Sequence, residues 1–274
     1  MSCLRHLLSI ALILLCPLAL AQSGGKPLTF AISEGTSGGL SAEATLNKYR
    51  PLLDLMEKTL GQEIKPIYVR DFNDLEKGMR EQRFDLLMAR PSDYPARGVR
   101  DYRYRLVTTG RPDGHCVLLV RKDSPLKTLA DVKGKRFIMP EKAAYLTKLC
   151  RAELRDKGIA LDQENVSYTK EQGAIPFALE NGISDVGGVS TYSGVYPAWL
   201  KQGHRVLHQS GPQPYMPLVA APSLGPEQLV RLRGALMELD KSDSGRQLLQ
   251  RIGVQGFNGG EDARLRKMLE WLEK

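Results

Sequence analysis

The order of the apolar segments restricts the fold of this 274-residue chain more than any other feature. Short apolar runs at 28–33, 64–69 and 84–89 are separated by stretches in which apolar residues recur at helical spacing. Buried strands of parallel sheets appear as short apolar runs, and the helices between them are amphipathic. The first third therefore predicts the order β-α-β-α-β, typical of a sheet with helices on its faces. Because proline disrupts a helix interior, we expect the regular part of the first helix to begin only near Tyr49, shortly before Pro51.

A second set of alternating segments follows a turn-rich break at 111–114. A similar break at 208–214 precedes a final strand and three helices. The sequence therefore predicts two lobes, with the chain crossing from one to the other and back. The first lobe is discontinuous and comprises 26–111 and 211–274, and the second comprises 112–210. The predicted fold class is α/β, with each lobe a mostly parallel sheet flanked by helices and a ligand cleft between the lobes.

The first 21 residues have the layout of a secretory signal peptide. Arg5 precedes an apolar run with no acidic residue, and Ala19-Leu20-Ala21 has the small-x-small pattern of a cleavage site. The run is shorter than a spanning helix needs. We expect cleavage after Ala21 and a periplasmic protein. A retained anchor is the alternative, and a lipid on Cys16 is disfavoured because Leu14-Leu15 stand where small residues are required.

Charge and motifs exclude several classes of function. The formal net charge is +8, but the basic residues are scattered, which argues against a nucleic-acid partner. The sequence contains no Gly-x-Ser-x-Gly, Walker loop, His-Glu-x-x-His or Cys/His cluster at zinc spacing, so we expect no enzyme, no catalytic residue, no metal and no cofactor. Cys116 and Cys150 remain after cleavage. They predict either one disulfide or two separately buried thiols.

Several segments resemble the phosphate/phosphite/phosphonate-binding proteins of ABC importers, within the type II periplasmic binding protein superfamily. They cover most of the chain after the signal peptide, in the expected order. The Asp-Ser-Pro to Lys-Gly-Lys segment is common to many type II proteins and indicates the fold more than the ligand. The matching segments are Tyr49-Arg50-Pro51-Leu52-Leu53, Phe84-Asp85-Leu86-Leu87, Val117 to Pro125, Leu129 to Phe137, Ala178-Leu179-Glu180-Asn181-Gly182 and Ile252 to Phe257.

The resemblance implies a solute-binding protein whose ligand lies in loops after the strands, where open α/β sheets bind ligands. The chain departs from the family there. Glu141-Lys142-Ala143-Ala144 replaces a hydroxyl-rich run, Gln172 stands where the family usually has histidine, and Arg90 replaces a small residue. The candidate ligand-binding residues are Glu34, Arg90, Ser92, Tyr94, His115, Glu141, Lys142, Tyr145, Gln172 and Tyr192.

These departures predict a small organic anion or zwitterion in preference to phosphate or simple alkylphosphonates. A ligand carboxylate would contact Arg90 and an amine would lie near Glu141. Each tyrosine can equally be a packing residue, His115 a packing or hinge residue, and Lys142 a solvated charge. We expect a monomer that serves an ABC permease. The alternative is a module that signals to a membrane sensor kinase, which fold alone does not distinguish.

Overall fold

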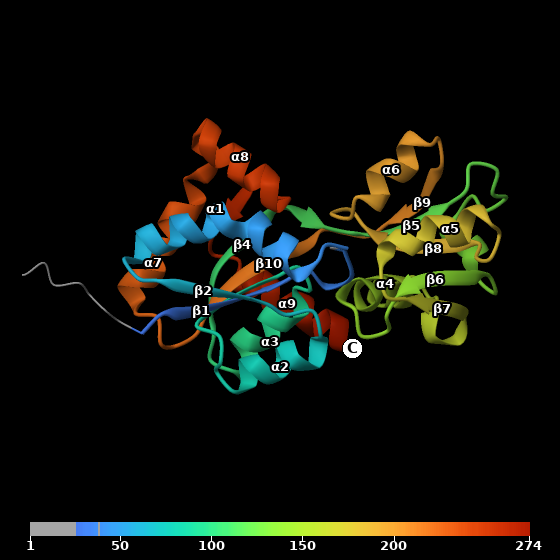
Figure 1. Cartoon of the computed structure of the whole chain (residues 1–274). Coiled ribbons are helices and arrows are strands. Elements are labelled where there is room, and N and C mark those ends of the chain that lie inside the picture. The colour runs from blue at the N-terminus through green and yellow to red at the C-terminus, as the bar shows by residue number, and fades with distance from the viewer. Residues whose placement is uncertain (1–25, 38) are drawn as a thin grey trace, which may run out of the picture.

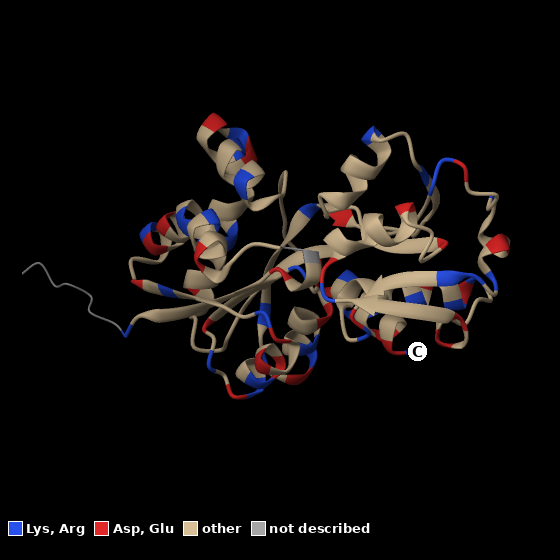
Figure 2. Ribbon diagram, turned by 45° about the vertical axis from the view of Figure 1, so that its right-hand side comes forward, with Lys and Arg blue, Asp and Glu red and all other residues tan. Residues whose placement is uncertain are grey.

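The computed structural model describes residues 26–37 and 39–274. The predicted signal peptide and its cleavage site lie outside these residues. Two β-sheets flanked by helices form two lobes that lie side by side (Figure 1), which confirms the predicted two-lobed α/β class. Acidic and basic residues are interspersed over both lobes (Figure 2). Within the described ranges, no helix combines the length and apolar character that crossing a bilayer requires.

The first lobe is built on a six-stranded sheet, which we call sheet 1. Its strand order is β11-β4-β10-β3-β1-β2. The strands are β1 (Leu28–Ser33), β2 (Ile64–Tyr68), β3 (Leu86–Ala89), β4 (Arg105–Gly114), β10 (Gln213–Ala220) and β11 (Gly256–Asn258). The helices of this lobe are α1 (Ala42–Leu60), α2 (Phe72–Arg80), α3 (Asp93–Asp101), α7 (Pro226–Met237), α8 (Asp243–Ile252) and α9 (Asp262–Glu273).

The second lobe is built on a five-stranded sheet, sheet 2, with the order β7-β6-β8-β5-β9. Its strands are β5 (Cys116–Val120), β6 (Arg136–Pro140), β7 (Asn165–Thr169), β8 (Val186–Ser190) and β9 (Arg205–Gln209). Its helices are α4 (Tyr145–Asp156), α5 (Ile175–Glu180) and α6 (Val195–Lys201). Cys116 and Cys150 form a disulfide that joins β5 to α4, which confirms the bridged alternative.

Most strands of each sheet run in the same direction, as predicted, and β10, β11 and β5 run against them. β1 pairs in parallel with β2 and β3, and β6 pairs in parallel with β7 and β8. β10 is antiparallel to β3 and β4, and β5 is antiparallel to β8 and β9. The cause is the double crossing: the chain leaves sheet 1 along β4 and returns along β10, so these neighbours run in opposite directions.

The predicted break at 111–114 is part of β4. Tertiary pairing holds this turn-rich segment extended, because Gly256 lies opposite Arg111 and Gln213 lies opposite Gly114. The predicted lobe boundary after residue 111 thus falls inside a strand. The change from sheet 1 to sheet 2 occurs at His115, and the return lies between β9 and β10.

Helix α1 also differs from its prediction, because it begins at Ala42, so that Pro51 lies in its interior. The Ser41 side chain caps it by accepting a hydrogen bond from the Ala44 amide at 3.1 Å. Pro51 has no N–H for the carbonyl of Asn47, and Arg251 of α8 donates to that carbonyl at 3.0 Å instead. A contact from elsewhere in the chain thus supplies what the proline removes.

One hydrophobic cluster extends through both lobes. It contains Tyr94 and Met268 of the first lobe together with Tyr145 and Leu149 of the second. Separate clusters cover the opposite face of each sheet, under α1, α7 and α8 in one lobe and α5 and α6 in the other. The lobes are therefore in apolar contact on the side where α4 meets α9.

Candidate functional site

The carboxyl ends of the parallel strands face the junction between the lobes. Cys116, the first residue of β5, lies opposite Ser190, the last residue of β8, so the chain enters sheet 2 at that edge. β4 runs in the same direction as β1 and β3 and leaves sheet 1 at their carboxyl edge. Side chains that follow β1, β3, β6 and β8 are thus brought together, where open α/β sheets usually bind ligands.

A small cavity, the inner cavity, lies between the lobes. Its volume is about 10 Å³, which is room for about one water molecule. The lobes are therefore closed on each other at this point. It is lined by Glu34, Gly35, Thr36, Phe72, Arg90 and Pro91 of the first lobe and by Tyr145, Leu146, Gln172 and Tyr192 of the second.

Glu34 is a buried carboxylate that follows β1. Its Oε1 accepts hydrogen bonds from Lys48 Nζ at 2.5 Å and from the Tyr49 hydroxyl at 2.9 Å, both on α1. Burial alone would raise the pKa of Glu34, but the charges of Arg90 and Lys48 outweigh it and hold the pKa below its usual value. Glu34 is therefore ionised at neutral pH.

Arg90, which follows β3, directs its guanidinium toward Glu34 with Nη2 3.4 Å from Oε1. Nη2 also donates to the carbonyl of Ile252 at 3.3 Å, and Nη1 donates to the carbonyl of Tyr192 at 3.4 Å. The group lies 6.0 Å from the centre of the Tyr215 ring. Its Nε is buried with no hydrogen-bond partner among the described residues. Arg90 is thus held by several long contacts, one of which comes from the second lobe.

Gln172 forms the second-lobe wall of the inner cavity. Its Oε1 accepts hydrogen bonds from the backbone N–H of Ser190 at 2.9 Å and from the Ser190 hydroxyl at 3.2 Å. This fixes the loop after β7 to the end of β8. Because an amide oxygen has two lone pairs, both acceptor positions are in use, and the NH₂ group is what remains for another partner.

A larger cavity, the outer cavity, adjoins the inner one and shares Gly35, Thr36 and Phe72 with it. Its volume is about 240 Å³. Arg70 and Asp71 line it from the first lobe, and Glu141 and Lys170 line it from the second. An ion pair between Arg70 and Glu171 spans the lobes beside it.

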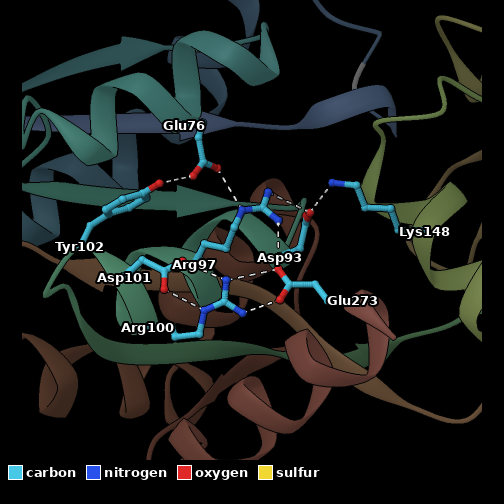
Figure 3. Close-up of polar contacts among 8 residues, drawn as sticks. All are labelled: Glu76, Asp93, Arg97, Arg100, Asp101, Tyr102, Lys148 and Glu273. Atoms are coloured by element: carbon cyan, nitrogen blue, oxygen red, sulfur yellow. Dashed lines mark hydrogen bonds and ion pairs between the residues drawn. The ribbon is translucent and has the colours of Figure 1, made fainter.

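An ionic network joins the lobes beside the cleft (Figure 3). Lys148 of α4 lies 2.7 Å from Oδ2 of Asp93, a buried carboxylate at the start of α3. Arg97 lies 3.2 Å from the same oxygen and pairs with Glu76 at 3.0 Å. Four further residues extend the network, because Tyr102 donates to Glu76 and Arg100 pairs with Asp101 and Glu273.

The structure brings six of the ten predicted ligand-binding residues to the two cavities. Five line the inner cavity and Glu141 lines the outer one. The other four lie elsewhere: Ser92 donates to the carbonyl of Arg90, Tyr94 stacks on Phe72, His115 is 2.7 Å from the carbonyl of Ser210, and Lys142 is exposed near Asp162. Contact of any of the ten with a ligand stays a prediction.

Other lining residues were not predicted. Lys170 directly follows β7 and Arg70 lies two residues after the end of β2, so the rule of strand carboxyl ends would have selected them. Asp71 was interpreted only as a helix cap, which it is, because it accepts from the Asn73 and Asp74 amides. Nothing in the sequence marks Leu146 as a cavity residue. Among the described residues, no cluster of three or more potential metal ligands occurs.

Comparisons with known proteins identify the family and similar folds. The family described as ABC-transporter, phosphonate, periplasmic substrate-binding protein matches residues 39–265. The phosphonates-binding periplasmic protein of Escherichia coli K12 is 30% identical over 124 residues, which cover 42% of this chain and about a third (34%) of that protein.

Solved structures show the same fold at low sequence identity. XAC2383 of Xanthomonas citri, bound to ATP, is 17% identical and has a TM-score of 0.72, with 89% of this chain and 97% of that chain covered. PhnD1 of Prochlorococcus marinus, in complex with methylphosphonate, is 16% identical and has a TM-score of 0.71, with 90% and 97% covered.

Proposed function

Because this chain belongs to the phosphonate family of ABC-transporter periplasmic substrate-binding proteins, we propose that it captures a small zwitterion or organic anion between its lobes and delivers it to an ABC permease. The family consists of transport proteins rather than enzymes. Its fold accommodates different anions, since one structural neighbour holds ATP and another holds methylphosphonate. The ligand of this chain must therefore be argued from its own residues.

The balance of charge in the cleft supports the choice of ligand. The charged side chains that line the two cavities are three cations and three anions: Arg70, Arg90 and Lys170, with Glu34, Asp71 and Glu141. A dianion would meet three carboxylates and no excess of positive charge. A zwitterion can satisfy both signs, and leaving either sign unpaired in a closed cleft costs several kcal/mol.

The outer cavity is the proposed position of the solute. Its volume of about 240 Å³ is below the range of roughly 300–1,000 Å³ that is usual for drug-sized ligands, so it suits a small molecule. The oxyanion would contact Lys170 and the ammonium would contact Glu141. This revises the expected contact of a ligand carboxylate with Arg90, because that guanidinium already pairs with Glu34.

Calorimetric titration of the protein tests the ligand class. We expect an aminocarboxylate and an aminophosphonate to bind at least tenfold more tightly than methylphosphonate or inorganic phosphate. Glu141→Gln should weaken binding of the zwitterions about tenfold, which is the loss of one charge-assisted contact, and should not weaken methylphosphonate. Glu238→Gln is the matched control, because Glu238 forms an exposed ion pair with Lys241. Methylphosphonate binding as tightly as the zwitterions, with no effect of Glu141→Gln, would contradict the proposal.

Location and partner are part of the same proposal. We propose export to the periplasm with cleavage after Ala21, so the N-terminal sequence of periplasmic protein should begin at Gln22. A chain that retains Met1 or carries a lipid on Cys16 would contradict this. A sensor kinase stays the alternative partner, and co-purification with a permease or with a sensor distinguishes the two.

A further inference from the structure

The inner cavity contains less free space than any small solute needs, and the reason is a side chain of the protein. Of its lining residues, Arg90 places a full cationic head group against the buried carboxylate of Glu34. The remaining volume of about 10 Å³ admits about one water molecule. A solute could enter the inner cavity only if this head group moved.

The surroundings of the Arg90 guanidinium resemble a binding site for a free cation. They consist of one carboxylate, the carbonyl of Ile252 at the end of α8, the carbonyl of Tyr192 from the second lobe and the face of the Tyr215 ring. The C-terminal end of a helix and an aromatic face both favour positive charge. The contacts come from both lobes, as those of a solute in a two-lobed binding protein do.

The contacts of the Arg90 guanidinium are also longer than the contact of Lys48 with Glu34. The three to Nη atoms are 3.3–3.4 Å, whereas Lys48 approaches the same carboxylate at 2.5 Å. Nε has no hydrogen-bond partner among the described residues. The Arg90 head group, attached at the end of β3, therefore leaves one of its five donors without an acceptor in the described part of the chain.

We propose that Arg90 is a built-in occupant of the inner cavity and thereby a specificity-determining residue. It fills the position in which Glu34 would otherwise accept a cationic group of a solute, and it confines solutes to the outer cavity. This rests on the proposed function, because it assumes that the cleft between the lobes is the solute site. It predicts that shortening Arg90 converts the inner cavity into a site for a small guanidinium.

The test is chemical rescue of Arg90→Ala by methylguanidinium at constant ionic strength. Calorimetry should detect saturable binding to Arg90→Ala and none to the wild type. At a methylguanidinium concentration about ten times the Kd, the melting temperature of Arg90→Ala should rise by about 3 °C or more. Methylammonium, which lacks the planar set of donors, should give at least a tenfold weaker effect.

Two variants separate volume from charge. Arg90→Met keeps most of the volume of the side chain, so methylguanidinium should not bind to it. Glu34→Gln combined with Arg90→Ala leaves the volume open but removes the anion, and binding should fall at least tenfold. If Arg90→Ala fails to fold, methylguanidinium must raise its yield on refolding without raising that of Arg90→Met.

Folded Arg90→Ala that does not bind methylguanidinium, or equal binding to Arg90→Ala and Arg90→Met, overturns the proposal. Titration of the wild type with zwitterions is independent of this result. A wild type that binds no solute contradicts the proposed function, whereas absent rescue alongside normal solute binding contradicts only the role of Arg90.

Discussion

At the scale of single residues, Glu34 is the carboxylate on which the centre of the cleft depends. It is buried beside Arg90 and Lys48, and Tyr49 donates to it. A buried ion pair contributes little relative to an apolar pair, but removal of one partner leaves the other charge without compensation. The cleft is therefore sensitive to loss of either charge.

Glu34→Gln should lower the free energy of unfolding by about 3 kcal/mol at pH 7, because Arg90 stays buried without its counter-charge. The folded-state pKa of Glu34 lies below its ordinary value of 4.5. The stabilisation is thus complete above pH 4.5 and is lost as the pH falls through the folded-state pKa. Urea denaturation of both proteins at a series of pH values should show their difference shrinking below pH 4.5.

Glu238→Gln serves as the control for that experiment. Glu238 pairs with Lys241 on the surface, and exposed pairs contribute about 1 kcal/mol or less. If the difference in unfolding free energy between wild type and Glu34→Gln stays constant down to pH 3, the neighbours of Glu34 do not lower its pKa.

Sequence patterns selected the positions of these residues but not their partners. Glu34 and Arg90 were predicted to lie in the cleft because they follow predicted strands. Their pairing with each other depends on the parallel alignment of β1 and β3, which periodicity does not determine. Tyr49 was predicted only to lie near the start of the first helix, and its hydroxyl contact with Glu34 was not expected.

At the scale of elements, α1 is helical through Pro51 because Arg251 compensates the carbonyl of Asn47. We expect Arg251→Ala to lower the free energy of unfolding more in the wild type than in the Pro51→Ala variant. In that variant, the new N–H of residue 51 can donate to the carbonyl of Asn47. A double-mutant cycle followed by urea denaturation should give a coupling of about 0.5–1 kcal/mol. Additive effects of the two substitutions would mean that solvent, and not Arg251, satisfies the carbonyl.

The disulfide between β5 and α4 links residues 34 positions apart. Cross-links of this kind typically contribute about 2–4 kcal/mol by restricting the unfolded chain. Reductant should therefore lower the melting temperature of the wild type and leave that of Cys116→Ala/Cys150→Ala unchanged. Labelling of both thiols in denatured, unreduced protein would contradict the bridge.

The elements that sequence patterns predicted well are those whose cause is local. Pro226 lies in the first turn of α7, and Gly61 and Gly253 cap the C-terminal ends of α1 and α8, as these residue types commonly do. The elements predicted wrongly depend on distant partners: β4 is extended through 111–114 because β10 and β11 pair with it. Helix α3 was missed because its start, Ser92-Asp93-Tyr94-Pro95, has the composition of a turn.

At the scale of the whole molecule, contacts of the protein itself hold the lobes together. Lys148→Met removes the contact of α4 with the buried Asp93. We expect the radius of gyration in small-angle X-ray scattering to increase. Without Lys148, hydration of the Asp93 carboxylate is more favourable than its burial against the second lobe, which favours opening of the lobes. Lys241→Met, which removes an exposed pair within one lobe, should leave it unchanged. An unchanged radius for Lys148→Met would show that the shared hydrophobic cluster alone keeps the lobes closed.

The strand order of sheet 1 also fixes the sequence in which the lobes can form. The chain leaves a ribosome or an export channel with its N-terminus first. Every strand of sheet 2 is available once Gln209, the end of β9, has emerged. β10, which separates β3 from β4, and β11 come only afterwards. Until then β3 and β4 present unpaired edges and uncovered apolar faces, which favour aggregation. The lobe that begins the chain is therefore the last to mature, because its core is complete only when α9 has emerged.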